Sequence, residues 1–478
     1  MDRHFIHIYP ARMRFLSILC FCISFFGFAQ KCLADDGLHK VFITFDQCSE
    51  TFARGTFAID DPSTPILADI RYRGSSALKY TKKAFALKLL DENEEQLDTA
   101  FFGMRCDNSW ILDAMAIDKA RMRNMVSFDI WNDFAEPPYH KYYEEDAING
   151  IRGVFVELYI NEEYAGLYCL EEKIDRKQLK LKKFKGEQAK GLLYKADMWA
   201  SFYQKSVSFY NYDNMSRSWD AWVCDYPEVE DDEPIDWAPL VNLIHFFSYE
   251  KRATVLSEID DRLDVPVWRD LFLFMELIKG EDNTSKNLFV YIYNMLQAEK
   301  FTCCPWDMDA TWGRTWDGEE MSAITEVVNR NYINSFFIYL YDGEAADYAT
   351  RYNQLRETYF RPEELKKRFD RYFDLFRESG AAAREEEKWN GVDGIEVDFD
   401  REQQYIHDWI DQRIEYLDKK YSLDPISIHS VSRSSEASAN LRDAQIFDLQ
   451  GRRISISTGS SASLPHGIYI VNGQKRLL

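Results

Sequence analysis

The alternation of apolar and polar residues predicts strands in the first part of the chain. Between residues 38 and 100, the segments VFITF, ADIRYRG and FALKLLD alternate β-forming and polar residues and end at Gly or charged turns. Residues 109–134 change to a near-helical spacing of large apolar residues, which predicts one long amphipathic helix. The segment GVFVELYINEEYAGLYCLEEKI then predicts a β-hairpin that turns within NEEYAG.

Apolar periodicity predicts helices over most of the chain after residue 237. Residues 237–280 are apolar-periodic, and a mostly helical region runs to Tyr421. Between these helices, GEDNTSKNLFVYIYN and FTCCPWDMDATWG predict a hairpin of buried strands with acidic residues at both ends. A Ser-rich stretch at 424–438 is typical of a linker, and residues 439–478 predict a small β module with Gly turns.

The N-terminal residues 1–34 have the pattern of a secretory signal peptide. Arg12 and Arg14 precede FLSILCFCISFFGFA, whose apolar length fits a signal peptide and is short for a membrane span. The alternative is an uncleaved anchor. We therefore expect an exported protein, located in the periplasm, on the cell surface or outside the cell.

Composition favours a folded, acidic protein of two or three domains. The chain has 478 residues, of which 46% are hydrophobic, so it can bury a sizeable core. Its 58 basic and 80 acidic residues give a net charge of −22, and this field excludes nucleic acid as an expected partner. An anionic substrate must therefore be held by a metal ion or by a local group of Lys and Arg. The Cys and His residues show no metal-binding spacing.

The acidic residues at the ends of the second hairpin suggest phosphoryl-transfer chemistry. Asp282 and Asn287 have the Asp-x-x-x-x-Asn spacing of a protein-kinase catalytic loop, in which the Asp accepts the hydroxyl proton and the Asn binds a metal. Asp307 follows the second strand, and the hairpin should bring it beside Asn287, where Mg²⁺ needs a hard oxygen ligand. Asp309 would point to the same side as Asp307 if the strand continued.

Such a site also needs a cation for the nucleotide phosphates. Lys88 ends the apolar strand segment Ala86–Lys88 and follows the Gly-containing loop 73–76. Taken alone, Lys88 is more simply a surface lysine, and Glu157 and Glu172 are either its partners or exposed strand residues. Two other predictions are structural: Asp118 and Arg123 form an ion pair within a helix, and Trp306 and Trp312 are core aromatics beside the site.

Seven blocks, in one order, resemble the CotH kinase family. They run from about residue 66 to about residue 420 and are RYRGSSALKYTKKAFALKL, WILDAMAIDKARMRN, GVFVELYINEEYAGLYCLEEKID, GLLYKAD, GEDNTSKNLFVY, PWDMDATWG and IHDWIDQRIEYL. The resemblance implies an α+β, atypical protein kinase-like fold within residues 38–423. A strand-rich N-lobe of about 38–174 and a helical C-lobe of about 175–423 would bind ATP and Mg²⁺ between them.

The resemblance also implies roles for single residues. Asp282 would be the catalytic aspartate, Asn287 and Asp307 would bind the metal, and Asp309 is the rival metal ligand. Lys88, Arg73 and Ser75 would lie near the triphosphate, and Glu172 lies in the segment 170–174, where a hinge between lobes would pass the adenine. This chain has RGSSA where the family often has RGNSS, which changes the phosphate loop.

The last residues resemble another known module. FDLQGRRI, LPHGIYIVNG and the terminal KRLL are similar to the C-terminal sorting domain of type IX secretion cargo. This resemblance implies that export machinery is a partner. The alternative is an ordinary accessory β-domain.

These observations predict an exported kinase that transfers the γ-phosphoryl group of ATP to Ser or Thr hydroxyls of a secreted protein. One alternative is an inactive, nucleotide-binding scaffold with the same fold. The other is a glycan-active surface protein in which Asp282 and Asp307 act as acid and base, although that leaves Asn287 and Lys88 unexplained.

Overall fold

The computed structural model describes most of the chain between residues 37 and 422. The described residues are 37–185, 190–199, 201–202, 211–228, 235–327, 336, 339 and 345–422, with four short strands between 446 and 477. The predicted signal peptide and Ser-rich linker lie outside these residues. The chain divides into two compact units: unit 1 contains 1–125, 151–174 and 369–402, and unit 2 contains 126–150, 175–368 and 403–478.

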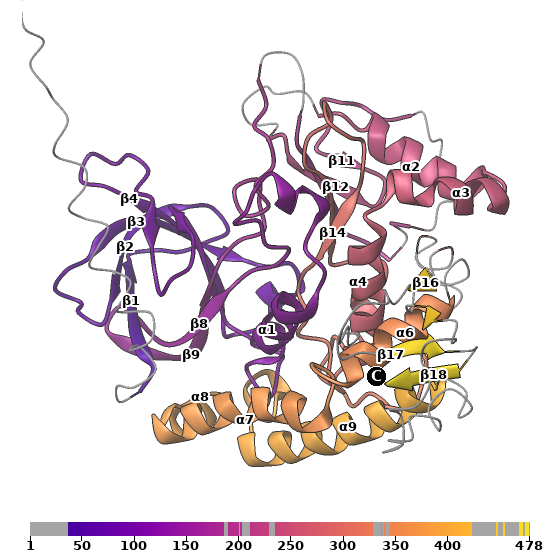
Figure 1. Ribbon diagram of the computed structural model, residues 1–478. Coiled ribbons are helices and arrows are strands. Elements are labelled where there is room, and N and C mark those ends of the chain that lie inside the picture. Colours follow the sequence, from indigo (N-terminus) through magenta and orange to yellow (C-terminus); the bar gives the residue numbers. More distant parts are fainter. Residues whose placement is uncertain are drawn as a thin grey trace, which may run out of the picture. The chain divides into compact units, whose positions relative to one another are not determined.

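Unit 1 is built on a closed barrel of seven strands (Figure 1). The barrel order is β1-β2-β3-β4-β7-β9-β8, and the strands are β1 His39–Phe45, β2 Ala53–Ile59, β3 Ile66–Arg73, β4 Ala84–Leu90, β7 Ser109–Asp113, β8 Gly153–Ile160 and β9 Glu163–Glu171. Neighbouring strands are antiparallel except β1 and β8, whose parallel pairing closes the barrel. The strands predicted from alternation at β1, β3 and β4 are confirmed, whereas β2 and the closure were not predicted.

The interior of the barrel follows the period-two pattern of its strands. On β4, Phe85, Leu87 and Leu89 are buried in the barrel core, whereas Lys88 between them is exposed. The predicted hairpin β8–β9 is confirmed. It turns through Asn161 and Glu162, which both have positive φ, as the favoured two-residue hairpin turns require.

The predicted helix at 109–134 is only partly correct. Its first residues form β7, and the helix α1 spans Arg123–Phe134. The large apolar residues near Ser109 fit the period of a helix and also that of a strand. The segment forms a strand because it pairs with β4 and β9. Asp118 therefore lies before α1, where its carboxylate accepts hydrogen bonds from the backbone N–H groups of Met122 and Arg123. Its ion pair with Arg123, at 2.6 Å, is buried and is not within a helix, contrary to the prediction.

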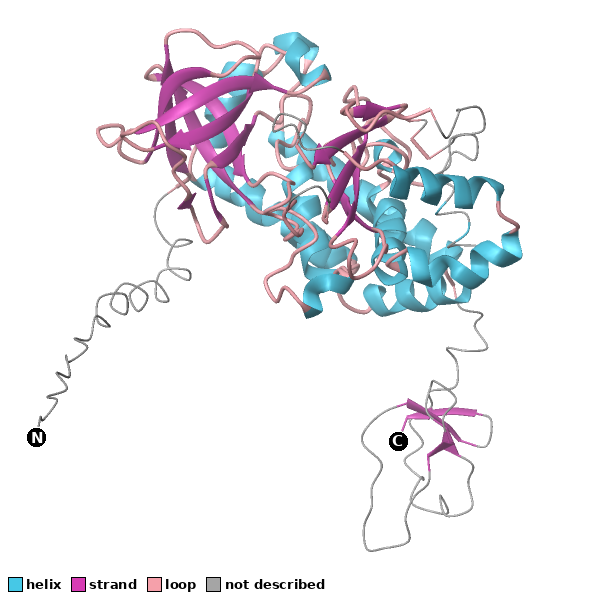
Figure 2. Ribbon diagram, turned by 90° about the horizontal axis from the view of Figure 1, so that it is seen from above, coloured by secondary structure: helices cyan, strands magenta, loops and turns pink. Residues whose placement is uncertain are grey.

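The remaining elements of unit 1 are short strands, 3₁₀ turns and helical segments. They are β5 Thr99–Ala100, β6 Cys106–Asp107, η1 Ser76–Lys79, η5 Val392–Gly394, α8 Ala381–Trp389, the end of α7 Pro362–Glu378 and the start of α9 Phe399–Lys420. The short helix α8 packs against β9 of the barrel (Figure 1). Figure 2 shows the barrel strands in magenta from a second direction.

Unit 2 combines helices with a five-stranded sheet. The sheet order is β11-β12-β10-β13-β14, and the strands are β10 Leu192–Ala196, β11 Ser218–Trp219, β12 Trp222–Tyr226, β13 Leu288–Ile292 and β14 Thr302–Pro305. The other elements are α2 Ala238–Tyr249, α3 Arg252–Arg262, α4 Val265–Ile278, α6 Ala345–Arg356, η2 Tyr139–Tyr142 and η4 Glu281–Asn283. The helices predicted at 237–280 are confirmed, and α4, almost wholly buried, packs against β14 (Figure 1).

The structure places short strands in the predicted C-terminal β segments. They form a four-stranded antiparallel sheet in the order β16-β15-β17-β18, with β15 Ile446–Phe447, β16 Arg453–Ile454, β17 Ile468–Val471 and β18 Gln474–Leu477. Most residues behind the resemblance to a sorting domain lie outside the described part.

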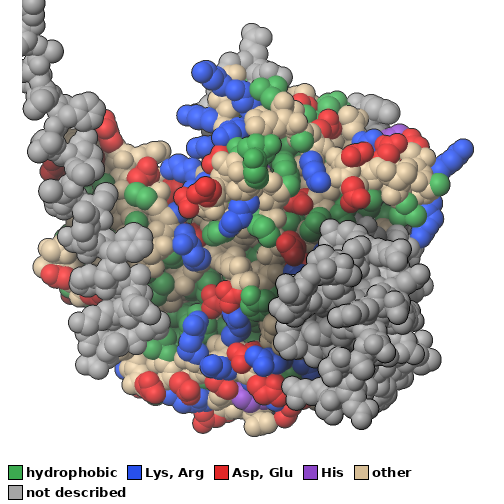
Figure 3. Space-filling model, viewed as in Figure 1, with side chains coloured by type: hydrophobic (Ala, Val, Ile, Leu, Met, Phe, Trp, Pro, Cys, Tyr) green, Lys and Arg blue, Asp and Glu red, His purple; other side chains and the backbone are tan. Residues whose placement is uncertain are grey.

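The predicted α+β class, strand-rich early and helical late, is confirmed. Within the described residues, each helix is too short or too polar to cross a bilayer. On the face in Figure 3, Lys and Arg side chains lie among Asp and Glu side chains.

Candidate functional site

The hairpin β13–β14 carries the predicted acidic site in unit 2. Every residue of both strands is buried, and Leu288 pairs with Pro305 at the end of the hairpin. One residue further, the Trp306 N–H donates to the Asn287 carbonyl at 3.0 Å. The sheet therefore holds Asn287 and the start of the 306–309 segment side by side, as the hairpin pattern predicted.

Asp282 lies in η4, directly after the buried helix α4, and is only 7% exposed. Its Oδ2 accepts hydrogen bonds from Lys286 Nζ at 3.0 Å and from Asn287 Nδ2 at 3.2 Å. Its Oδ1 is buried and has no hydrogen-bond partner among the described residues. Burial raises the pKa of the Asp282 carboxyl, Lys286 opposes this shift, and the nearby Asp307 carboxylate adds to it.

Several residues around this site have a left-handed backbone conformation. Four residues other than Gly have left-handed φ angles close to it: Lys279 (51°), Asn287 (52°), Asp307 (57°) and Trp312 (50°). Asn and Asp tolerate this conformation, whereas for Lys and Trp it is uncommon and costs free energy. Strained residues of this kind persist where the surrounding structure holds them, and they gather at functional sites.

Two residues of the site were missed by sequence reasoning. Asn283 is fully buried, and its Nδ2 donates to the backbone carbonyls of Trp306, at 2.6 Å, and Asp307, at 3.3 Å. It therefore ties the Asp307 loop to the Asp282 loop. Lys286 pairs with Asp282, and only its four-residue spacing from Asp282 could have signalled this contact.

Asp307 and Asp309 were predicted to point to the same side only if the strand continued, and it does not continue. β14 ends at Pro305, and the chain turns at Asp307, which has a left-handed φ. Asp307 is exposed, Met308 is buried, and Asp309 is half-buried. The prediction that Trp312 is a core aromatic is confirmed: it is fully buried, and its Nε1 donates to Ser127 Oγ at 2.9 Å.

The predicted nucleotide-binding residues belong to unit 1. Lys88 is exposed on β4, opposite Asp69 on β3, with its Nζ 4.8 Å from the centre of the Phe52 ring. Arg73 is half-buried at the end of β3, and Ser75 is exposed at the N-cap of η1.

Gly74, between Arg73 and Ser75, has a φ of 114° that side chains rarely adopt. A Cβ at this position would lie 2.8 Å from the Ala77 Cβ, so the turn requires glycine.

Two glutamates of the β8–β9 hairpin region, Glu157 and Glu172, are buried and paired, although the sequence predicted exposed residues or partners of Lys88. Glu172 is fully buried, and it accepts hydrogen bonds from the Arg105 N–H at 2.7 Å and from Arg152 Nη2 at 2.8 Å. Glu157 is 3% exposed and pairs with Arg384 Nε at 2.8 Å. Buried carboxylates need such donors because they have lost the solvation of water.

The residues around Asp282 fit a Mg²⁺ ion that substrate phosphate completes. The Asp307 carboxylate lies close enough to Asp282 to shift its pKa, and the Asn287 side chain contacts the Asp282 carboxylate, so Asp307 and Asn287 offer hard oxygens beside Asp282. In the described part of the chain, no group of three or more His, Cys, Asp or Glu side chains is placed to hold a metal. A carboxylate and an amide match the few protein ligands that Mg²⁺ uses beside phosphates and water.

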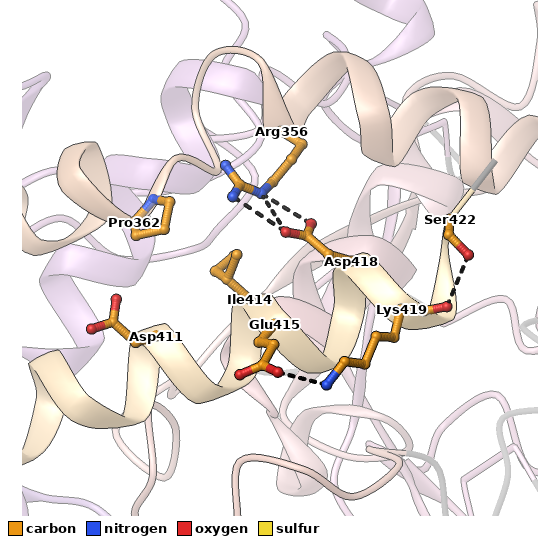
Figure 4. Close-up of a pocket in the computed structure, with 8 residues that line it drawn as sticks. All are labelled: Arg356, Pro362, Asp411, Ile414, Glu415, Asp418, Lys419 and Ser422. Atoms are coloured by element: carbon orange, nitrogen blue, oxygen red, sulfur yellow. Dashed lines mark hydrogen bonds and ion pairs between the residues drawn. The ribbon is translucent and has the colours of Figure 1, made fainter. Parts of the chain in front are cut away.

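A separate groove in unit 2 lies on the C-terminal half of α9. It has a volume of about 570 Å³ and is lined by Arg356, Pro362, Asp411, Ile414, Glu415, Asp418, Lys419 and Ser422. Figure 4 shows Arg356 directed to Asp418 and Lys419 directed to Glu415, and both are ion pairs. Because its charges neutralise one another and no residue of the hairpin lines it, this groove is not the candidate site.

Comparison with protein families gives one match. The family model described as CotH kinase protein matches residues 70–417, which is more than half of the chain and includes the whole β13–β14 hairpin. A comparison with curated proteins found no match.

Proposed function

The chain belongs to the CotH kinase family, and from this premise we propose that it is an exported kinase that phosphorylates proteins. It transfers the γ-phosphoryl group of ATP to Ser or Thr hydroxyls of secreted or surface proteins, and the reaction depends on Mg²⁺. The observation that carries the proposal is the buried Asp282, whose Oδ1 has no hydrogen-bond partner within the described part of the chain, while Lys286 and Asn287 hold Oδ2.

In this reaction Asp282 acts on the acceptor hydroxyl. Its carboxylate accepts the hydroxyl proton as the hydroxyl oxygen bonds to the γ-phosphorus and the bond from that phosphorus to the ADP oxygen breaks. The two hydrogen bonds to Oδ2 fix the orientation of the carboxylate. Asn287 and Asp307 would bind Mg²⁺, which neutralises charge on the phosphates. Asn283 keeps the Asp307 loop beside Asp282. Asp309 is the alternative metal ligand.

The residues of unit 1 bind the nucleotide in this proposal. Lys88, Arg73 and Ser75 contact the triphosphate, and the turn at Gly74 brings backbone N–H groups to it. Glu172 belongs to the segment that passes the adenine, and its bonds to Arg152 and Arg105 support the backbone there. The kinase-like arrangement of an N-lobe and a C-lobe is part of the same proposal.

Export rests on the two ends of the sequence. Residues 1–34 direct the chain across a membrane, and residues 439–478 engage the export machinery. Fractionation of cells that express the full chain, with and without residues 439–478, tests this part separately from the enzymatic activity.

The enzymatic proposal is tested by phosphoryl transfer from radiolabelled ATP with the full chain. We expect Mg²⁺-dependent labelling of Ser or Thr in the protein itself or in secreted proteins. Asp282→Asn should lower the rate by at least about 10³-fold, because it removes the base that accepts the hydroxyl proton. The matched control is Asp260→Asn on α3, an exposed aspartate that should leave the rate unchanged.

Three outcomes would overturn the proposal. Binding of ATP and Mg²⁺ without transfer would favour the scaffold, and equal transfer by Asp282→Asn would remove this site from the reaction. Polysaccharide cleavage that survives removal of nucleotide and divalent metal would favour the glycan-active alternative.

A further inference from the structure

We infer that Met198 and Trp199 are specificity-determining residues, which bind a large apolar side chain of the acceptor protein close to the phosphorylated Ser or Thr. This inference rests on the proposed kinase function and deepens it, because it assigns a sequence class to the acceptor. Both residues belong to unit 2 and lie just after β10, separated from it by Asp197.

The two side chains are exposed although they are large and apolar. Trp199 is 39% exposed and Met198 is 59% exposed. Apolar side chains of this size usually lose most of their contact with water on folding. Trp and Met are also enriched on surfaces that bind other proteins. The pair therefore has the composition of a small binding surface.

Hydrogen bonds hold the turn that presents this pair. The Ser201 N–H donates to the Met198 carbonyl at 3.0 Å. The Ser201 hydroxyl is buried, and its oxygen lies 2.6 Å from the Met198 carbonyl and 2.9 Å from the Ala221 carbonyl. The Trp222 Nε1 donates to the Ser201 carbonyl at 2.7 Å. Because the turn is already ordered, a partner that binds to it loses less free energy to conformational ordering.

The turn lies beside the residue that receives the acceptor proton. At the end of β10, the Ala196 carbonyl accepts the Asn287 N–H at 3.0 Å. The centre of the Trp199 ring lies 5.9 Å from Lys286 Nζ, which itself lies 3.0 Å from Asp282 Oδ2. These two distances place the ring within about 9 Å of the Asp282 carboxylate. An extended peptide advances about 3.3 Å per residue, so the ring is within reach of a side chain one to three positions from the acceptor hydroxyl.

The chemistry of the pair selects an apolar residue such as Leu, Met or Phe. The Trp199 ring offers a large apolar face, and the flexible thioether of Met198 adapts to side chains of different shape. The adjacent charged residues, Lys195 and Asp197, pair with each other at 3.2 Å. The favoured acceptor is therefore a Ser or Thr with a large apolar residue within three positions.

The test uses synthetic Ser peptides of equal length and charge, which the full chain phosphorylates with ATP and Mg²⁺. The residues around the Ser are Ala, Gly and Gln, and a single Leu is moved through the three positions on each side. We expect Leu in at least one position to raise kcat/KM about 10-fold over the peptide without Leu. Trp199→Ala should abolish most of this preference and Met198→Ala part of it, while Trp199→Phe, which keeps an aromatic face, should retain it. The rate with the Leu-free peptide and the KM for ATP should stay nearly unchanged in all three variants.

The matched control is Tyr249→Ala, which removes an aromatic side chain of 56% exposure at the end of α2 and should leave the preference unchanged. An active enzyme without a preference for Leu, or a preference that Trp199→Ala retains, would overturn the inference and leave the proposed function intact. Equal slowing of all peptides or a raised KM for ATP in Trp199→Ala would also overturn it, because the ring would then have a structural or nucleotide-binding role. Labelling of proteins but of no peptide would have the same meaning, since recognition would depend on more distant residues. A wild type without any phosphoryl transfer would overturn both proposals.

Discussion

Removal of the Glu385 carboxylate is expected to destabilise unit 1 strongly. Glu385 lies on α8 and is fully buried. Its Oε1 accepts hydrogen bonds from Lys82 Nζ at 2.6 Å and Arg121 Nε at 2.8 Å, and its Oε2 accepts one from the Leu167 N–H at 2.7 Å. The side chains of Lys82 and Arg121 are each only 2% exposed. In Glu385→Ala, two buried cations therefore lose the carboxylate with which both of them are paired.

The size of the effect follows from what remains around these cations. Removing one partner of a buried ion pair costs about 3–5 kcal/mol, because the other charge stays buried. Arg121 keeps three backbone carbonyl acceptors, of Met115, Ala116 and Asp118, and Lys82 keeps the Leu167 carbonyl. These acceptors compensate in part for the missing carboxylate. We therefore expect the free energy of unfolding to fall by about 3–5 kcal/mol, although two cations lose this partner. This is a large part of the free energy of unfolding of a typical domain.

The destabilisation caused by Glu385→Ala should also depend on pH, because Lys82 titrates. Burial lowers the pKa of Lys82 to about 7, the Glu385 carboxylate opposes this shift, and Arg121 adds to it. Between this pKa and the ordinary value near 10.5, the unfolded chain binds more protons than the folded chain, so stability rises with pH in that window. Without Glu385 the pKa of Lys82 falls further. The destabilisation relative to wild type should therefore be larger at pH 6 than at pH 9.

The assay is urea unfolding at pH 6 and pH 9, followed by circular dichroism and tryptophan fluorescence. Glu415→Ala is the matched control, because it removes a glutamate that forms an exposed ion pair with Lys419 on a helix. It should change the unfolding midpoint little at either pH. A Glu385→Ala variant as stable as this control would refute the reasoning, and a loss that grows towards pH 9 would refute the role of Lys82.

Three further predictions concern other described residues. His140 is fully buried with its ring stacked 4.8 Å from that of Tyr293, and burial lowers its pKa to about 4. Below about pH 6.5 the imidazole of His140 takes up a proton in the unfolded chain but not in the folded chain. The free energy of unfolding should therefore fall by up to about 3 kcal/mol between pH 6.5 and 4. Melting curves of His140→Phe should lack this contribution of His140. Asn283→Ala should lower the free energy of unfolding in urea by about 1–3 kcal/mol, because the carbonyls of Trp306 and Asp307 lose their donor. It should also slow phosphoryl transfer. Full activity of this variant would contradict the role of Asn283 in positioning the Asp307 loop. Gly74→Ala should weaken ATP binding in calorimetry, because the added Cβ would clash with Ala77. The control is Gly391→Ala, which also has a positive φ but has open space around the added Cβ, and it should leave ATP binding unchanged. Equal weakening by both variants would exclude the contact with Ala77 as the cause.

Local patterns in the sequence predicted most elements but not the closure of the barrel. Alternation identified β1, β3, β4 and the β8–β9 hairpin, and apolar runs with polar ends identified the buried β13–β14 hairpin. Both kinds of pattern are local, and the strands of each hairpin pair with a near neighbour in sequence. The parallel pairing of β1 with β8 joins residues more than a hundred positions apart, for example Val41 with Leu158, and no short-range pattern records it. The misassigned start of the helix at 109–134 has the same origin, since its pairing with β4 and β9 decided its structure.

Some residues of the candidate site could be predicted from their spacing in the sequence, whereas others depend on the conformation of loops. Spacing indicated Asp282, Asn287 and Asp307, because a hairpin necessarily brings its two ends together. The contacts of Asn283 and Lys286 depend on backbone turns at left-handed residues, which allow a side chain to reach a carbonyl or a carboxylate that no strand or helix period would align with it. Polar residues that lie between two recognised motif positions are therefore the first place to look for additional residues of a site, because the loop that positions the motif also positions them.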